Sequence, residues 1–285
     1  MHKTLILDNY EGLFSKNRAE SSLIAKLFAG YLFSPHIFEN HEGIQLLVND
    51  TYKRNIIDHQ STVDTTYFLK IKDLFRDTSK KGPPPSMDKK VARSIFTNGA
   101  FDIGISSETN IETDRKTNLI LFELKFLTDL SVDQTLQEIE LCKSLASHTF
   151  VDSKNEVNIG NVYMIAITTF ANLHFSRVLT VDINGMVTVP GIGQLPDNLR
   201  VITFDTVADV IIKTRALSER HELAANRVLA YMYRRSDAKT VTVDGKAKGG
   251  TRHLLHDSTK RKIEILLAER PISKNTIVSE RNRLP

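Results

Sequence analysis

The sequence predicts an α/β protein in which helices flank a mixed central sheet. Helical periodicity of apolar residues over 131–146 and alternating apolar residues over 101–105 are the first two observations. The third is a nearly continuous apolar run over 161–170, typical of a strand that is buried on both faces. Because such strands are interrupted by helices along the chain, we expect a mixed sheet rather than a sandwich or a bundle.

Composition places the 285-residue chain among ordinary globular proteins, with 41% hydrophobic and 25% charged residues. This excludes collagen, low-complexity and wholly disordered proteins. The apolar runs are far shorter than the roughly 20 residues of a membrane helix, so we expect no membrane partner. The N-terminus reaches Asp8 after three apolar residues, unlike a secretory signal. The single Cys142 permits a reducing compartment, and we expect a cytoplasmic location.

The first elements are predicted from periodicity and capping. An apolar stripe over 15–33 predicts an amphipathic helix, and Asn17 with Glu20 forms a variant of the capping box. Residues 64–76 are predicted to be helical. A proline-rich loop over 82–86 is followed by a short helix over 88–96.

The central part of the chain changes to strand patterns. Strands are predicted over 101–105 and 119–127, joined by a long polar hairpin loop over 106–118. A helix over 131–146 and a buried strand over 161–170 follow. The hairpin, the helix and the strand therefore come in that order.

The last elements begin with a hairpin over 177–189 that turns at Asn184-Gly185. A strand over 199–204 leads into a helix that starts near Asp205. Two further helices are predicted over 218–233 and 259–269.

Charge divides the chain into two predicted parts, a core over 1–212 and a basic C-terminal helical extension over 213–285. The extension holds 17 Lys and Arg against 8 Asp and Glu. Such an imbalance favours a nucleic-acid partner, although a solvated basic tail explains it as well. The residues expected to contact DNA are Lys89, Lys90, Arg234, Arg235, Lys246, Lys248, Arg252, Lys260 and Arg261.

The candidate chemistry lies on the two central strands. Glu123 and Lys125 share one face of an otherwise apolar strand, and Asp102 is the only charge in the strand before it. If the two strands pair, Asp102 lies beside Glu123. Two close carboxylates repel unless a proton or cation separates them, and their oxygen atoms suit Mg²⁺ or Mn²⁺. Together with a lysine, they are the groups that phosphodiester hydrolysis requires.

Asp102 and the sequence Glu123-Leu124-Lys125 resemble the motif of the PD-(D/E)XK nuclease superfamily, and the order helix, hairpin, helix, strand around them looks similar. The resemblance implies a restriction-endonuclease-like fold. It implies Asp102 and Glu123 as metal ligands, with the Leu124 carbonyl as a further one, and Lys125 as the residue that positions or activates water. Some members use an acid from the first helix, which would be Glu20. Phe101 stands where the family commonly has proline.

The helix after the second strand offers further polar residues. Some branches of the family place a Gln of this helix at the site, in a Gln-x-x-x-Tyr pattern that neither Gln134 nor Gln137 completes. We therefore interpret Gln134, Gln137 and Glu138 as a solvated helix face. Cys142, between apolar residues of the same helix, is interpreted as a small core residue.

These observations predict a Mg²⁺-dependent DNA endonuclease acting on double-stranded DNA. Because one site cuts one strand, cleavage of both strands implies a homodimer. Two alternatives remain open. One is an inactive nucleic-acid-binding or assembly protein on the same fold. The other is an unrelated α/β protein in which Glu123 and Lys125 form an ion pair.

Overall fold

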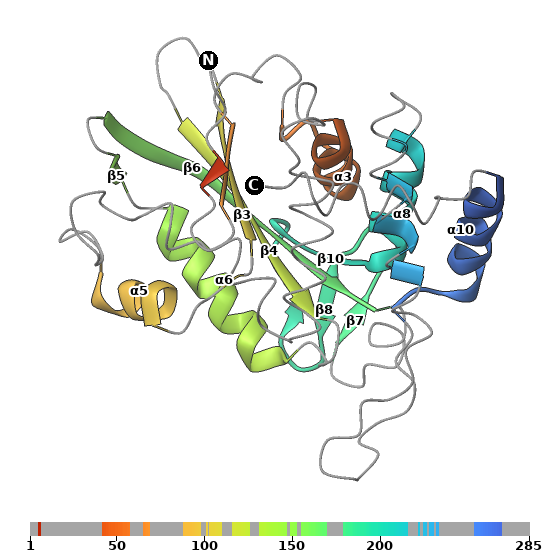
Figure 1. Cartoon of the computed structure of the whole chain (residues 1–285). Coiled ribbons are helices and arrows are strands. Elements are labelled where there is room, and N and C mark those ends of the chain that lie inside the picture. The colour runs from red at the N-terminus through yellow and green to blue at the C-terminus, as the bar shows by residue number, and fades with distance from the viewer. Residues whose placement is uncertain are drawn as a thin grey trace, which may run out of the picture.

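The computed structural model has a mixed α/β architecture, with a central sheet between layers of helices (Figure 1). This confirms the predicted α/β class and the mixed sheet. The structure describes residues 5–6, 42–57, 65–68, 88–97, 101, 103–109, 116–125, 131–146, 149–152, 155–169, 179–215, 222, 225–226, 228–230, 232–233 and 254–269. The predicted helix over 15–33 lies outside these residues.

The central sheet has seven strands in the described part of the chain, in the order β1-β2-β3-β4-β6-β10, with β5 paired to β6. The strands β2, β3 and β4 form an antiparallel meander, whereas β6 runs parallel to β4 and β10 runs parallel to β6. The strands are β1 (Leu5–Ile6), β2 (Thr65–Phe68), β3 (Ile103–Thr109), β4 (Lys116–Lys125), β5 (Thr149–Asp152), β6 (Asn155–Thr168) and β10 (Leu199–Thr203).

Two sequence-based predictions about the meander are wrong. The segment predicted as helix over 64–76 contains strand β2, because its β-branched and aromatic residues pair with β3, Tyr67 opposite Ile105. The hairpin loop predicted over 106–118 is shorter, since β3 continues to Thr109 and β4 begins at Lys116. Polar residues of this hairpin therefore take part in the hydrogen-bonded pairing of β3 with β4.

Helix α3 (Glu42–Tyr52) was not predicted. Its buried residues Ile44, Leu47 and Val48 follow helical spacing and are at most 1% exposed. The hydroxyl of Tyr52, at its last residue, donates to the carbonyl oxygen of Met164 at 2.7 Å. The helix is thereby fixed across the middle of strand β6.

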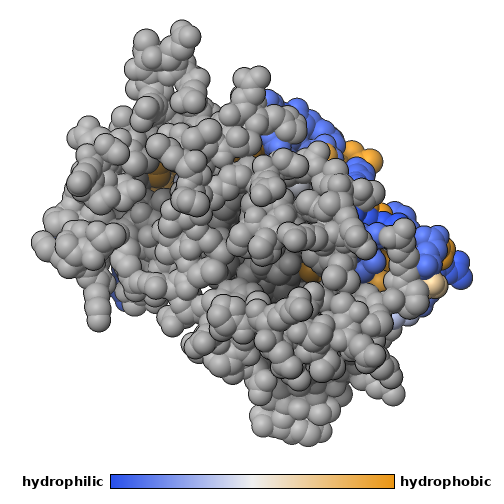
Figure 2. Space-filling view, turned by 45° about the horizontal axis from the view of Figure 1, so that its top comes forward, coloured by the Kyte–Doolittle hydropathy of each residue, from blue (hydrophilic) through white to orange (hydrophobic). Residues whose placement is uncertain are grey.

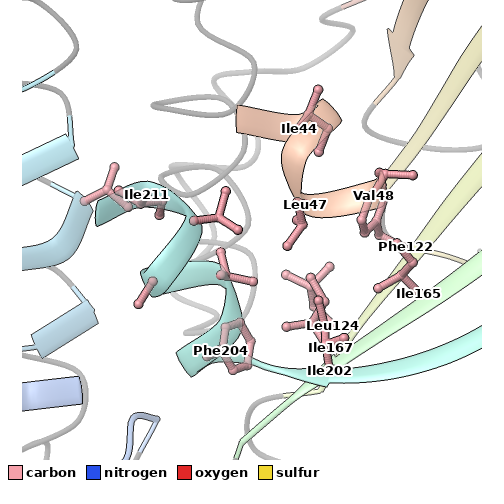
Figure 3. Close-up of a cluster of buried hydrophobic side chains, with 14 of the residues drawn as sticks. Ile44, Leu47, Val48, Phe122, Leu124, Ile165, Ile167, Ile202, Phe204 and Ile211 are labelled. Carbon is pink, nitrogen blue, oxygen red and sulfur yellow. The ribbon is translucent and has the colours of Figure 1, made fainter. Parts of the chain in front are cut away.

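Side chains of β4 alternate between two faces of the sheet, as predicted. Ile120, Phe122 and Leu124 belong to one apolar cluster with α3 and α8 (Phe204–Thr214), the helices that cover this face. Figure 3 shows Phe122 and Leu124 in this cluster. Phe122 is fully buried in this cluster. Below, this side of the sheet is called the α3 face.

The opposite side, called the α6 face, is covered by α6 (Val132–Ala146), which confirms the predicted helix over 131–146. Leu119 and Leu121 belong to its apolar cluster. The face is completed by α5 (Lys89–Ala92), η2 (Arg93–Thr97) and a small sheet of β7 (Thr180–Val181), β8 (Val187–Val189) and β9 (Gly193–Gln194).

The predicted turn between β7 and β8 is confirmed. Gly185 has a φ of 77°, in the left-handed region that glycine adopts without strain. A Cβ atom at this position would lie 2.8 Å from the carbonyl oxygen of Val201, so the turn packs directly on β10.

The described C-terminal residues pack against the core. Leu255 and Ile263 belong to the cluster on the α3 face, and the last predicted helix is observed as α10 (Asp257–Glu269). The backbone N–H of His256 donates to Asp205 of α8 at 2.8 Å. In Figure 2, the described residues at the right of the view, where Figure 1 places α8 and α10, present a mainly hydrophilic surface. The division at residue 212 stays a prediction.

Candidate functional site

Glu123 and Lys125 form a buried ion pair at the carboxyl end of β4. The ammonium nitrogen of Lys125 lies 2.5 Å from Oε1 of Glu123, and the two side chains are only 16% and 8% exposed. Because both residues occupy odd positions of the strand, they lie on the α6 face, whereas Leu124 between them is buried on the α3 face. The predicted pairing of charges on one face is therefore observed.

Two residues of α6 contact this pair. The side-chain Nε2 of Gln134 donates to Oε1 of Glu123 at 3.0 Å and to Oε1 of Glu138 at 2.7 Å. Glu138 is 6% exposed and Gln134 is half-buried. The interpretation of these two residues as a solvated helix face is therefore wrong, although Gln137 is exposed as predicted. The helix places them together because residues four apart share one side of it.

The start of α6 is fixed by Ser131, which directly precedes the helix. Its hydroxyl accepts from the backbone N–H of Gln134 at 3.4 Å, and its carbonyl oxygen accepts from the backbone N–H and the hydroxyl of Thr135. Since the first turn is anchored in this way, the side chain of Gln134 is directed to the end of β4.

The two oxygen atoms of Glu123 have different surroundings. Oε1 is held by both Lys125 and Gln134, whereas Oε2 has no hydrogen-bonding partner among the described residues. A carboxylate with one oxygen so fixed keeps the other available for a cation.

Thr168 lies beside the ion pair on the neighbouring strand. It is the register partner of Lys125 on β6 and is itself opposite Thr203 on β10. Its hydroxyl is fully buried and finds no hydrogen-bonding partner in the described part of the chain. The three residues mark the carboxyl ends of three neighbouring parallel strands, where open α/β sheets bind ligands.

Asp102 and Glu20 lie outside the described residues. Ile103, which follows Asp102 in sequence, pairs with Phe122 of β4. Phe101, which precedes Asp102 in sequence, is buried and has a φ of 61°. A bulky residue in this left-handed region is strained, and such strain is concentrated at functional sites.

The residues expected to contact DNA fall into three groups. Lys89 and Lys90 are exposed in the first turn of α5, which Asp88 caps. On α10, Arg261 is exposed, whereas the Lys260 side chain is only 16% exposed and lies 3.6 Å from Asp257. The remaining predicted contacts are outside the described residues, namely Arg234, Arg235, Lys246, Lys248 and Arg252.

Cys142 is buried on the α6 face, as predicted for a small core residue. Burial, and then the negative charge of Glu138, raise the pKa of its thiol well above the ordinary value. The thiol therefore stays protonated at neutral pH and is a poor nucleophile or metal ligand.

Across the described residues, no group of three or more His, Cys, Asp or Glu side chains is placed to hold a metal ion. None of the described helices has the length and hydropathy that crossing a lipid bilayer would require. Comparison of the chain with known protein families, curated proteins and solved structures found no match.

The sequence contains a signal for the burial of Glu138. Glu138 precedes the buried residues Leu141, Cys142 and Leu145 by three, four and seven positions, so it lies on the apolar side of α6. Thr168 gave no comparable signal, because a threonine at the end of an apolar strand is common.

Proposed function

We propose that the protein is a divalent-metal-dependent nuclease of the PD-(D/E)XK superfamily, with a restriction-endonuclease-like fold. The observation that carries the proposal is the buried Glu123–Lys125 pair on the α6 face, whose carboxylate keeps Oε2 without a described partner. Burying charged groups in an apolar sheet costs roughly several kcal/mol in lost hydration, and an ion pair offsets this cost only in part. A hydrolytic site gives both residues a use.

The order of elements around the pair supports the proposal. The β3–β4 hairpin is followed by α6 and then by β6, which pairs parallel to β4. This matches the part of the implied order that follows its first helix. The strain at Phe101, next to Asp102, is a second and independent support.

The donor set fits Mg²⁺ or Mn²⁺. Glu123 and Asp102 would hold the ion through carboxylate oxygens, and the Leu124 carbonyl would be a further ligand of the type that hard cations prefer. Glu20 stays an additional candidate. When bound, the ion supplies positive charge that polarises the phosphoryl group of a nucleic acid.

Residues of the chain itself would orient the carboxylate of Glu123 and stabilise negative charge on the substrate. Gln134 and Lys125 fix one oxygen of Glu123, so the carboxylate keeps a single orientation. The ammonium group of Lys125 is close enough to this site to offset negative charge that develops on phosphoryl oxygens. Lys89, Lys90 and Arg261 would bind the phosphate backbone of double-stranded DNA without reading its sequence. Cleavage of both strands requires two copies of the chain.

A cleavage assay tests the proposal. Supercoiled plasmid is incubated with the protein and Mg²⁺, with an EDTA control and the variants Lys125→Ala and Asp102→Ala. We expect nicked or linear DNA from the wild type, and rates lowered by about a hundredfold or more in both variants.

Lys143→Ala is the matched control, because Lys143 is an exposed lysine of α6 that pairs with Glu140 on the surface. It should cleave like the wild type. Equal cleavage by the wild type, Lys125→Ala and Asp102→Ala would contradict the proposal.

One observation favours a second candidate function, an inactive nucleic-acid-binding or assembly protein. The ammonium of Lys125 is already paired with Glu123 at 2.5 Å, as in a purely structural ion pair. This candidate expects salt-sensitive DNA binding, measured by fluorescence anisotropy, with no cleavage at any Mg²⁺ concentration.

A further inference from the structure

The side-chain amide of Gln134 lies between two carboxylates. Its nitrogen is 3.0 Å from Glu123 and 2.7 Å from Glu138. A glutamine amide has two N–H donors and one carbonyl acceptor, and ionised carboxylates only accept. The contacts therefore use both N–H groups and direct the amide carbonyl away from the two acids.

We infer that Glu138 is a positioning residue of the metal site, acting through Gln134 on Glu123; this inference rests on the proposed function. Glu138 dictates the orientation of the amide, because the opposite orientation would place the amide carbonyl against its carboxylate. With the N–H groups so directed, Gln134 holds Oε1 of Glu123 together with Lys125. Oε2 of Glu123 is then presented for the divalent ion.

The burial of Glu138 supports a specific role. It is 6% exposed and belongs to the side of α6 that packs on the sheet beside Ile139 and Leu141. An apolar residue would pack there without a desolvation cost. Groups that hold a metal ligand in one orientation raise metal affinity, and their loss typically costs about tenfold to a hundredfold in affinity or activity.

The test compares Glu138→Gln with Glu140→Gln. The first replacement keeps the size of the side chain but offers both a donor and an acceptor, so the amide of Gln134 is no longer held in one orientation. The second alters a glutamate two residues away on the same helix, exposed and paired with Lys143. Binding of Mn²⁺ is measured by titration calorimetry on the full chain, and plasmid cleavage is measured across Mg²⁺ concentrations.

We expect Glu138→Gln to weaken Mn²⁺ binding by about tenfold or more and to shift the Mg²⁺ dependence of cleavage in the same direction. Glu140→Gln should match the wild type in both. A metal-free thermal melt shows whether each variant is folded. If Glu138→Gln does not fold, Gln134→Met, which removes the amide itself, takes its place with the same expected loss of Mn²⁺ affinity.

The outcomes separate the inference from the proposed function. Unchanged Mn²⁺ affinity in a folded Glu138→Gln protein overturns the positioning role, even where the wild type cleaves DNA. Weakened Mn²⁺ affinity in that variant, without DNA cleavage by the wild type, supports the positioning role and overturns the nuclease. A wild type that binds no Mn²⁺ overturns both.

Discussion

The two faces of strand β4 differ in what they contain, although their residues alternate along one segment. On the α3 face, Phe122 and Leu124 are buried among aliphatic side chains of α3 and α8. On the α6 face, the buried residues Glu123 and Glu138 lie with the partly buried side chains of Lys125 and Gln134. One face is therefore organised for packing, whereas the other keeps polar groups at a desolvation cost that packing alone does not explain.

The largest expected effect on stability concerns the α3 face. Phe122→Ala should lower the free energy of unfolding by about 3–5 kcal/mol, because it leaves a cavity in a fully buried cluster. Urea unfolding followed by circular dichroism measures this change. A loss below about 1 kcal/mol would show that the face is not closely packed.

A smaller effect is expected from Cys142 on the α6 face, and it depends on pH. Burial raises the pKa of this thiol in the folded protein, so the folded chain keeps a proton that the unfolded chain releases. Stability from this group is present below the unfolded pKa, near 8.5, and falls as the pH rises above it. Between about pH 7.5 and pH 10, the wild type should lose about 1–2 kcal/mol more than Cys142→Ala.

Urea unfolding at several pH values measures this difference. Parallel stability curves for the wild type and Cys142→Ala would contradict a protonated, buried thiol. Thiol labelling provides a check, since native Cys142 should react far more slowly than the unfolded chain.

The smallest expected changes in the free energy of unfolding should have opposite signs on the two faces. The hydroxyl of Thr168 is buried on the α6 face without a described partner, so Thr168→Val should raise the free energy of unfolding by about 1 kcal/mol. Thr214 of α8, which is also buried, donates to the carbonyl oxygen of Val210 at 2.9 Å. Thr214→Val should therefore lower it by about 1 kcal/mol.

Both threonine variants are compared by the same urea unfolding experiment. Valine has the shape of threonine and a similar helix propensity, so the hydroxyl is the only group that is lost. Equal destabilisation by both variants would show that the hydroxyl of Thr168 makes a hydrogen bond in the folded protein. The contrast between the two buried threonines would then be contradicted.

Sequence patterns predicted those elements in which local periodicity and tertiary packing agree. Alternation placed Glu123 and Lys125 on one face, and helical spacing predicted α6 and α10. The prediction of a helix over 64–76 failed at β2, where pairing with β3 decides the conformation. The helix α3 was not predicted, although its buried residues follow helical spacing.

The candidate site was predicted in part for the same reason. Glu123 and Lys125 are neighbours on one strand, so their meeting follows from local geometry alone. The contact of Gln134 with Glu123 requires α6 to cross back over the sheet, and the interpretation of Gln134 as part of a solvated helix face, drawn from the missing Gln-x-x-x-Tyr pattern, was wrong.

The mixed α/β class, the alternation of β4 and the helix over 131–146 follow from the amino-acid sequence, because each depends on neighbours along the chain. The link that Gln134 makes between Glu138 and Glu123, and the position of Thr168 beside Lys125, depend on how distant elements pack together. These contacts join separate elements, and their geometry is set by how a helix packs on a sheet and how parallel strands align.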